Sequence, residues 1–519
     1  MKKYYSNIKN DIPASIVVFF VAIPLCLGIA LASGAPLFSG LIAGIVGGII
    51  VGTISGSEIG VSGPAAGLAA IVLTSIGTLG GYENFLLAVV IGGAIQFAFG
   101  LLGAGLIGQY FPSSVIKGML TGIGLIIIFK QIPYFFGYNK PEEVDSLTAT
   151  NFFSLIDLGS TIVVICGLFI LIFWETVLSK KSKIFQLIQG PLVAVIFGIT
   201  YTFLTKGNDQ WGIASEHLVN IPIITNFSSA GDLLMLPNFA VFSDINVWIV
   251  GFTIALVASL ETLLCVEATD KLDTEKRATP KNRELIAQGV GNMMSGIVGG
   301  LPVTQVIVRS SANIQSGGKT KVSAIIHGFL LLISIITIPT LLNKIPLSVL
   351  ASILFIVGYK LAKPQLFKSM YKIGWKQFLP FLITVTGIIF TDLLMGIFIG
   401  LIFSIAIILL ESYRNSHSIS IEESPKDNKH KIIMNLSEEV TFLNKESISR
   451  ELNALPINTN LIIDVSKTKY IDNDIVEVLD DFLEITKEKK ISIKIISQNV
   501  ELDNLDSINQ IFQNKRKIA

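Results

Sequence analysis

One arginine stands in an otherwise apolar part of the sequence. Residues 299–313 read GGLPVTQVIVRSSAN, and Arg309 falls where a helix would begin after an extended, Pro-containing stretch. A guanidinium at membrane depth costs at least about 2.5–3.5 kcal/mol, and the positive end of a helix repels it further. An anion between Arg309 and the helix end would offset both costs. Arg309 is therefore a candidate anion-binding residue, and a structural pairing with a glutamate is the alternative.

Glu261 is the acidic residue best placed to act together with this arginine. It lies in the middle of the apolar run that contains ASLETLLC (258–265), and the next residue, Thr262, adds a hydroxyl. Their oxygens suit a proton or Na⁺, because burial of a carboxylate favours its neutralisation. Two roles follow for Glu261: a coupling-ion site formed with Thr262, or a permanent counter-ion for Arg309.

The elements that must position these residues are membrane spans. Hydrophobic residues make up 51% of the 519 residues and charged residues 15%, whereas soluble domains carry about 25% charged residues. Apolar runs of roughly bilayer length predict an α-helical membrane protein with about fourteen transmembrane segments. They fall at 12–32, 37–54, 62–79, 84–106, 114–132, 157–177 and 185–204, and then at 246–266, 284–300, 305–317, 322–343, 346–363, 376–391 and 393–412.

Charge becomes dense only near the end of the chain. We therefore predict a transmembrane domain at 1–415, with repeats at about 12–204 and 246–412, and a small soluble domain at 416–519. Lys and Arg gather at the N-terminus and in every second loop, whereas the loops near 138–156 and 205–245 carry only Lys140 and Lys206. The positive-inside rule then predicts a multi-pass protein of the inner (plasma) membrane, with its N-terminus and soluble domain in the cytoplasm.

Weak internal similarity relates the two series of spans. FPSSVIKG (111–118) matches IPLSVLAS (345–352), and VSGPAAGLAA (61–70) takes the place of VTQVIVRSSA (303–312). Seven spans per repeat is an odd number, so the second repeat must run inverted through the membrane. Discontinuous helices at matching positions of inverted repeats indicate a transporter's binding site. The two half-helix N-termini would meet near mid-membrane and favour an anion there.

Small residues line the first half of this predicted site. Ser62, Gly63, Ala65 and Ala66 can offer backbone N–H groups and one hydroxyl to a ligand. In the first span, Pro24 removes a backbone hydrogen bond and kinks the helix. We therefore expect Ala22, Leu25 and Cys26 to form the wall of the pocket.

Several other classes of protein find no support in the sequence. The four histidines are scattered, and the three cysteines have neither metal-site nor disulfide spacing, so we predict no enzyme, no cofactor and no metal apart from Na⁺ at Glu261 and Thr262. No phosphate-binding loop suggests direct drive by ATP. A net charge of +1 gives no electrostatic footprint for nucleic acid.

Longer motifs resemble a known family. Residues 259–328 contain ELIAQGxGN, GGxPVT and RSxxN in this order, which resembles the sulfate permease (SulP) family of anion transporters and channels. The resemblance implies fourteen spans, a C-terminal STAS domain and usually a homodimer. It also implies an anion between the third and tenth spans, at Ser62–Ala66 and Val308–Ser310, walled by the first and eighth spans. PLCLGIA in the first span departs from many sulfate carriers and resembles the bicarbonate branch.

Together these features predict a secondary active transporter of a small inorganic anion, bicarbonate or sulfate, coupled to H⁺ or Na⁺. An anion channel or exchanger for chloride or bicarbonate without cation coupling is the alternative. A nucleobase permease of the same fold and a membrane receptor with the soluble domain as its output are further alternatives. In the soluble domain, residues 461–496 predict a strand, a loop, a helix and a strand, which fits a STAS fold.

Overall fold

The computed structural model describes residues 2–106, 111–137, 156–182, 185, 188–208, 210–223, 234–414, 417–423 and 430–496. Residues 138–155, with Lys140 of the first predicted outer loop, lie outside this set. The chain forms two compact units, residues 1–401 and 402–519. The predicted domain boundary at 415 directly follows a long helix that ends at Arg414. The boundary stays a prediction.

In the first repeat, the third span is not a continuous helix, because it begins with the short strand β1. Its elements are α1 (Lys2–Ala32), α2 (Leu37–Val46), a π-helical turn (Gly47–Val51), α3 (Gly52–Ile54), β1 (Ser62–Pro64), a 3₁₀ turn (Ala66–Leu68), α4 (Ala69–Thr78), α5 (Tyr82–Leu101), α7 (Ser113–Phe135), α9 (Leu158–Phe173), a second π-helical turn (Trp174–Leu178), α10 (Ser179–Lys181) and α12 (Gly190–Leu204).

In the second repeat, the corresponding tenth span likewise begins with a short strand, β2. Its elements are α13 (Ile245–Leu272), α14 (Lys281–Ile297), β2 (Val303–Gln305), α15 (Ile307–Gln315), α16 (Val322–Thr337), α17 (Pro339–Leu342), α18 (Leu347–Leu361), α19 (Pro364–Ile373), α20 (Trp375–Phe390) and α21 (Leu393–Arg414). Each predicted span coincides with a helix, or with a short strand followed by a helix. Among the described residues, eight helices are long and apolar enough to cross a membrane. The prediction of a multi-span helical membrane protein is confirmed.

Helix packing follows the predicted repeat. In the first repeat α5 packs against α13 and α14, and its counterpart α16 packs against α1 and α2. α7 packs against its own counterpart, α18. When each helix in these contacts is replaced by its counterpart in the other repeat, the contacts of α5 become the contacts of α16. This correspondence is expected for an inverted repeat.

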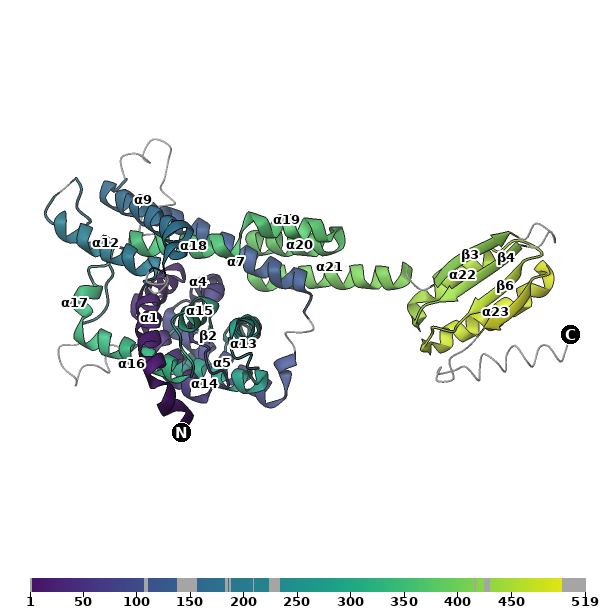
Figure 1. Ribbon diagram of the computed structural model, residues 1–519, viewed down its shortest axis with the longest axis horizontal. Coiled ribbons are helices and arrows are strands. Elements are labelled where there is room, and N and C mark those ends of the chain that lie inside the picture. Colours follow the sequence, from purple (N-terminus) through teal and green to yellow (C-terminus); the bar gives the residue numbers. More distant parts are fainter. Residues whose placement is uncertain are drawn as a thin grey trace. The chain divides into compact units, whose positions relative to one another are not determined.

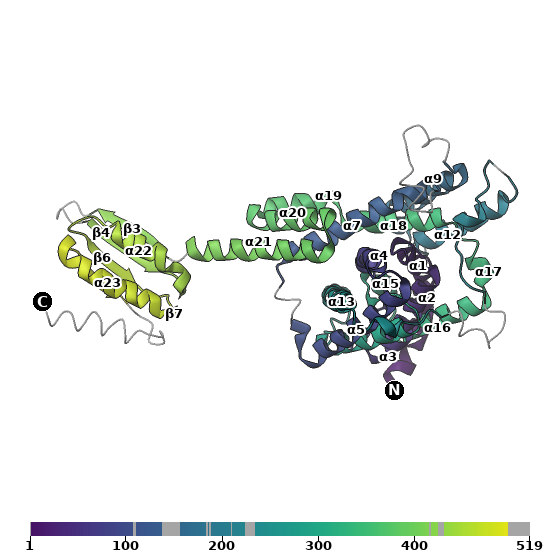
Figure 2. The same cartoon turned by 180° about the vertical axis from the view of Figure 1, so that it is seen from behind.

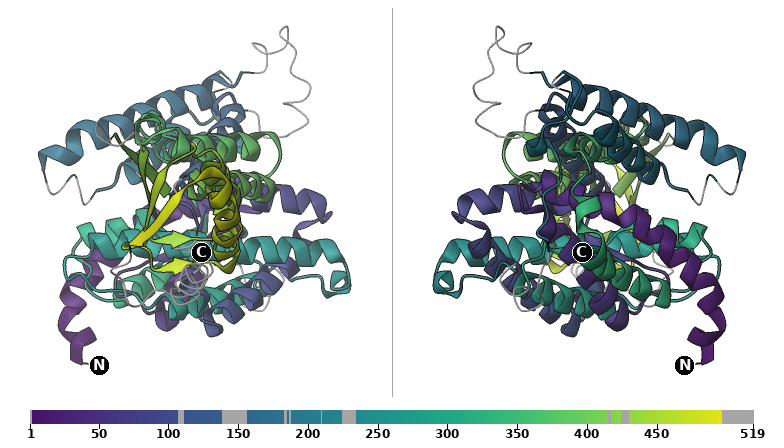
Figure 3. Two further views of the ribbon diagram at one scale, coloured as in Figure 1. Left: turned by 90° about the vertical axis from the view of Figure 1, so that its right-hand side faces the viewer. Right: turned by 90° about the vertical axis from the view of Figure 1, so that its left-hand side faces the viewer.

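The helices of the first unit form two layers. Figure 1 shows α7, α9, α12 and α18 along one layer and α1, α4, α5 and α13–α16 in the other. The view from behind (Figure 2) and the end-on views (Figure 3) give the same division. α1 contacts α18 and α12, so it joins the two layers.

α19 is a helix that the sequence analysis did not predict. The spans were recognised as continuous apolar runs, whereas α19 carries apolar side chains only at helical spacing. Met370 of α19 is 1% exposed, while Tyr371 and Ile373 are largely exposed. An amphipathic helix of this length escapes a search for bilayer-length runs.

The second unit is a small α/β fold. Its sheet has the strand order β3 (His417–Glu423), β4 (His430–Leu436), β6 (Asn460–Asp464) and β8 (Ser492–Ile496), and only the β3–β4 pair is antiparallel among these strands. The helices α22 (Lys445–Asn453) and α23 (Asn473–Lys489) complete it. Strand, loop, helix and strand occur at 461–496 as predicted, so the region is STAS-like.

Close contacts at glycine residues join α5 and α14, and these contacts allow a stability test. A Cβ on Gly289 of α14 would lie 2.5 Å from the Phe97 backbone nitrogen of α5, whereas a Cβ on Gly77 of α4 meets nothing within 4 Å. Backbone atoms cannot move aside cheaply, so we expect Gly289→Ala to lower stability by about 1–3 kcal/mol. Gly77→Ala should leave stability unchanged or raise it by about 0.5–1 kcal/mol. Thermal unfolding in detergent measures both, and equal melting temperatures would contradict this packing.

Candidate functional site

The two discontinuous segments meet in a two-stranded antiparallel ribbon. Ser62 pairs with Gln305, Gly63 with Thr304 and Pro64 with Val303. β1 leads through an extended Ala65 into the 3₁₀ turn and α4, and β2 leads through an extended Val306 into α15. The ribbon thus fixes the starts of two half-helices from opposite repeats beside each other. The first-turn N–H groups of such helices have no partner within the helix.

Arg309 lies against this ribbon and is 1% exposed. Among the described residues no oxygen accepts a hydrogen bond from its Nε, Nη1 or Nη2, and the Cys26 thiol that interacts with it is only a weak acceptor. A Cβ on Gly63 would overlap Nη1, so glycine is required there for the guanidinium to fit. Cys26 and His327 lie close enough to interact electrostatically with it. Within the described chain no carboxylate forms an ion pair with Arg309, so the alternative role, a structural pairing with a glutamate, has no partner there.

Two further polar residues on this face of α15, Ser310 and Asn313, form hydrogen bonds with the backbone of the first repeat. Ser310 Oγ donates to the Val306 carbonyl (2.8 Å) and accepts from the Val61 N–H (3.0 Å). Asn313 Nδ2 donates to the Ile59 carbonyl at 2.9 Å. Ser310, predicted as a substrate contact, therefore has a structural partner on each side.

α13 presents one polar side chain to each half-helix. The Gly67 N–H interacts with the Glu261 carboxylate, and the Ile307 N–H interacts with the Cys265 thiol. Glu261 and Cys265 are four residues apart and so lie on one face of α13. In the part of the chain that is described, Glu261 Oε2 and Thr262 Oγ1 are buried without a hydrogen-bond partner. Glu261 thus contacts the first half-helix, and an unsatisfied oxygen remains on each of the two predicted coupling residues.

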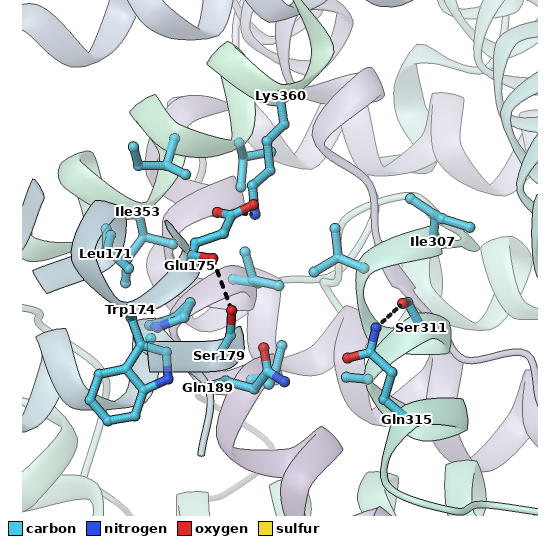
Figure 4. Close-up of a pocket in the computed structure, with 18 of the residues that line it drawn as sticks. Leu171, Trp174, Glu175, Ser179, Gln189, Ile307, Ser311, Gln315, Ile353 and Lys360 are labelled. Atoms are coloured by element: carbon cyan, nitrogen blue, oxygen red, sulfur yellow. Dashed lines mark hydrogen bonds and ion pairs between the residues drawn. The ribbon is translucent and has the colours of Figure 1, made fainter. Parts of the chain in front are cut away.

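A cavity of about 510 Å³ opens on the other face of α15. Figure 4 shows Ile307, Ser311 and Gln315 of α15 on one side of it, opposite Leu171, Trp174, Glu175 and Ile353. Leu25 and Val308, both predicted site residues, line this cavity, and Val308 is 42% exposed. The other predicted residues are all described and do not line it. The first two turns of α15 thus separate the cavity from Arg309.

The other predicted residues lie behind the cavity wall. Ala22 and Cys26 are fully buried in α1, and Ala65 is 1% exposed, while Ala66 is partly exposed. The Ser62 hydroxyl accepts a hydrogen bond from Gln288 Nε2 at 2.7 Å.

Sequence reasoning missed an ion pair in the cavity wall. Lys360 Nζ at the end of α18 lies 2.8 Å from Glu175 Oε2 in the π-helical turn after α9, and both side chains are about half exposed. The Tyr359–Lys360 pair at the end of a span was visible in the sequence, but its partner lies 185 positions away. Within the described residues no cluster of three or more His, Cys, Asp or Glu could hold a metal ion.

Fold and site together define a helical membrane transporter, built from inverted repeats around two broken helices. The family model of the sulfate permease family matches residues 8–384. The chain therefore belongs to the sulfate permease family, and it is a multi-pass transporter of inorganic anions, not an enzyme.

Similar proteins and solved structures agree with this assignment. The bicarbonate transporter BicA of Picosynechococcus sp. is 24% identical over 95% of this chain and 89% of its own. The chloroplastic sulfate transporter 4.1 of Arabidopsis thaliana is 23% identical over 95% and 76%. The transmembrane domain of a cyanobacterium BicA superposes with a TM-score of 0.63 at 25% identity, over 77% of this chain and 97% of that one.

Murine solute carrier 26 family member A9, solved in the inward-facing state, has a TM-score of 0.75 at 15% identity. That likeness covers 97% of this chain and 87% of that chain. At this identity it supports the fold alone. It extends over the STAS-like unit as well as the transmembrane helices.

The charges in the cavity wall lead to a test of anion entry. Glu175→Gln removes a negative charge beside Lys360, so we expect the KM for anion uptake to fall about two- to fivefold at low ionic strength, the scale of an exposed pair. Lys360→Gln should raise the KM by a similar factor. Both changes should shrink at about 1 M salt, where screening acts over about 3 Å.

Glu267→Gln supplies the control, because Glu267 forms an exposed pair with Lys271 (2.7 Å) and does not line the cavity. Initial uptake rates in proteoliposomes give the KM values. Equal KM values for all three variants at low salt would exclude this cavity from the anion's route.

Proposed function

We propose that this chain is a secondary active transporter of a small inorganic anion, bicarbonate or sulfate, coupled to H⁺ or Na⁺. The anion would bind between the half-helix starts at Ala65–Ala66 and Val308–Ser310, with Arg309 behind them. Leu25 and Val308 would meet it from the cavity of Figure 4. Ser62 and Gly63 would shape the site through the backbone, and Ala22 and Cys26 would support its wall.

The observation that carries this proposal is the unpaired guanidinium of Arg309. It is 1% exposed, no carboxylate pairs with it among the described residues, and the Cys26 thiol beside it is only a weak acceptor. A buried charge without a partner destabilises a protein by several kcal/mol. Two half-helix starts add roughly half a positive charge each. A bound anion is the simplest group that neutralises all three.

Bicarbonate and sulfate are both retained as substrates. The relatives named above include a bicarbonate transporter and a sulfate transporter with equal coverage of this chain. Radiolabelled bicarbonate, sulfate and chloride, offered to proteoliposomes under imposed Na⁺ and H⁺ gradients, would separate them. Uptake of none of the three would overturn the proposed function.

Glu261 and Thr262 are the proposed coupling residues. Each carries a buried oxygen without a partner among the described residues. Glu261 contacts Gly67 at the start of the first half-helix, so a cation bound there would lie next to the anion. Neutralising the carboxylate and binding the anion would then favour each other electrostatically.

A channel or exchanger without cation coupling is the second candidate. It is favoured by the same contact, because a Glu261 carboxylate held by the Gly67 N–H could serve as a fixed cap of that half-helix. A reversal potential that follows the anion gradient alone would support this candidate. We further propose a homodimer in the inner membrane, with the N-terminus and the STAS-like unit in the cytoplasm.

Replacement of Arg309 should separate stability from activity. Arg309→Met keeps the bulk of the side chain and removes the unpaired charge. We expect uptake to fall to background, and we expect the melting temperature in anion-free buffer to rise because the uncompensated charge is gone. Arg309→Lys, which retains the charge, is the matched control and should retain partial uptake.

Uptake and thermal unfolding of the same preparations measure both effects. Undiminished uptake by Arg309→Met would remove this residue from the mechanism. A lower melting temperature together with normal uptake would show that Arg309 has a structural role instead.

Replacement of Glu261 should abolish coupling. Glu261→Gln keeps the shape and cannot bind a proton or Na⁺ through a charge. We expect the variant to exchange labelled anion across the membrane but not to accumulate it under an H⁺ or Na⁺ gradient. Accumulation that still follows the gradient would leave Glu261 as the fixed cap of the second candidate.

A further inference from the structure

The β1–β2 ribbon needs hydrogen-bond partners on its outer edges. Each strand has three residues, too few for an isolated pair to be stable. The Val306 N–H donates to the Val61 carbonyl at 3.0 Å, so the ribbon's ladder bonds extend to this pair of positions. Because hydrogen-bonded pairs alternate along an antiparallel ladder, the backbone groups of Ser62 and Val303 face outward. Inside a membrane protein those groups must be satisfied by the protein itself.

α14 supplies the partner of β2 through one side chain. Asn292 Oδ1 accepts from the Val303 N–H at 2.5 Å, and Asn292 Nδ2 donates to the Val303 carbonyl at 3.0 Å. The same Nδ2 donates to Gln96 Oε1 of α5 at 2.7 Å. One carboxamide thus replaces a neighbouring strand and fastens β2 to α14 and α5 together.

One turn earlier on α14, the side chain of Gln288 contacts β1. Gln288 Nε2 donates to Ser62 Oγ at 2.7 Å and to Glu284 Oε1 at 2.9 Å. Glu284 Oε2 in turn accepts from Ser55 Oγ at 2.5 Å. Glu284, Gln288 and Asn292 are all fully buried. They are spaced four residues apart and therefore form one polar row on a single face of α14.

We propose that Gln288 and Asn292 are positioning residues for the anion site: from neighbouring turns of α14 they hold β1 and β2, and so set how far apart the two half-helix starts lie. The inference rests on the proposed function. β1 and β2 are separated from their helices by single extended residues, Ala65 and Val306. A shift of either strand therefore moves a helix start directly. Displacements of about 1 Å at a binding site can cost on the order of 100-fold in rate.

A merely structural role predicts a different kinetic result. If the row on α14 only stabilises the fold, its loss lowers the amount of active protein, so Vmax falls and the KM stays constant. If it positions the half-helices, the remaining folded protein binds the anion poorly and the KM rises. The KM–Vmax split therefore distinguishes the two.

Asn292→Leu is the main variant and Gln131→Leu is its control. Gln131 of α7 is also fully buried, and its amide atoms have no partner among the described residues, so the control removes a buried amide without touching either strand. Full-length protein in proteoliposomes is assayed with the anion that the unmodified chain transports. We expect the KM to rise about 10- to 100-fold in Asn292→Leu and to stay unchanged in Gln131→Leu.

Gln288→Met provides an independent arm, because Gln288 bonds only side chains and its loss leaves the β2 backbone paired. Gln288→Met should also raise the KM. If Asn292→Leu is not recovered in folded form, Gln288→Met alone tests the inference. Arg309-dependent uptake with an unchanged KM in these variants would overturn this inference alone. Absence of anion uptake by the unmodified chain would overturn the proposed function and this inference with it.

Discussion

A positive charge enclosed in protein without a counter-ion is the constraint on which the arrangement around the ribbon depends. Arg309 is almost inaccessible and unpaired within the described chain, and burial of such a charge is costly. Gly63 is needed to make room for it, and the half-helix starts beside it add to the positive potential. A protein that keeps these features together retains an unfavourable state that an anion can relieve.

A second constraint, the need to satisfy the backbone polar groups of the ribbon, explains why so many side chains converge on two three-residue strands. Non-helical backbone inside a membrane protein must be satisfied by protein groups. Ser310 and Asn313 of α15 reach the first repeat, and Asn292 of α14 completes β2. α13 contributes Glu261 and Cys265 to the two helix starts. The broken helices are thereby tied to α5, α13 and α14, and α5 packs closely against α13 and α14 at glycine residues.

Sequence patterns predicted most of the architecture, because apolar run length and the Gly/Pro interruptions are local signals. They also drew attention to Arg309, since a lone cation in an apolar stretch is conspicuous. Partners across the chain were not predictable. Ser62 accepts a hydrogen bond from Gln288, which is 226 positions away, and Glu261 contacts Gly67, whereas an arginine partner was considered for it. The cavity wall around Lys360 and Glu175 combines helices that no local pattern relates.

The central claim, that an anion binds between the two half-helix starts next to Arg309, is tested most directly by solid-state NMR. The full-length protein, labelled with ¹⁵N at arginine side chains, would be reconstituted with ¹³C-bicarbonate, or with ⁷⁷Se-selenate if sulfate is the transported anion. The account predicts a through-space dipolar coupling between the bound anion and an arginine guanidinium that disappears in Arg309→Lys. A bound anion that shows no such coupling in the unmodified protein would contradict it.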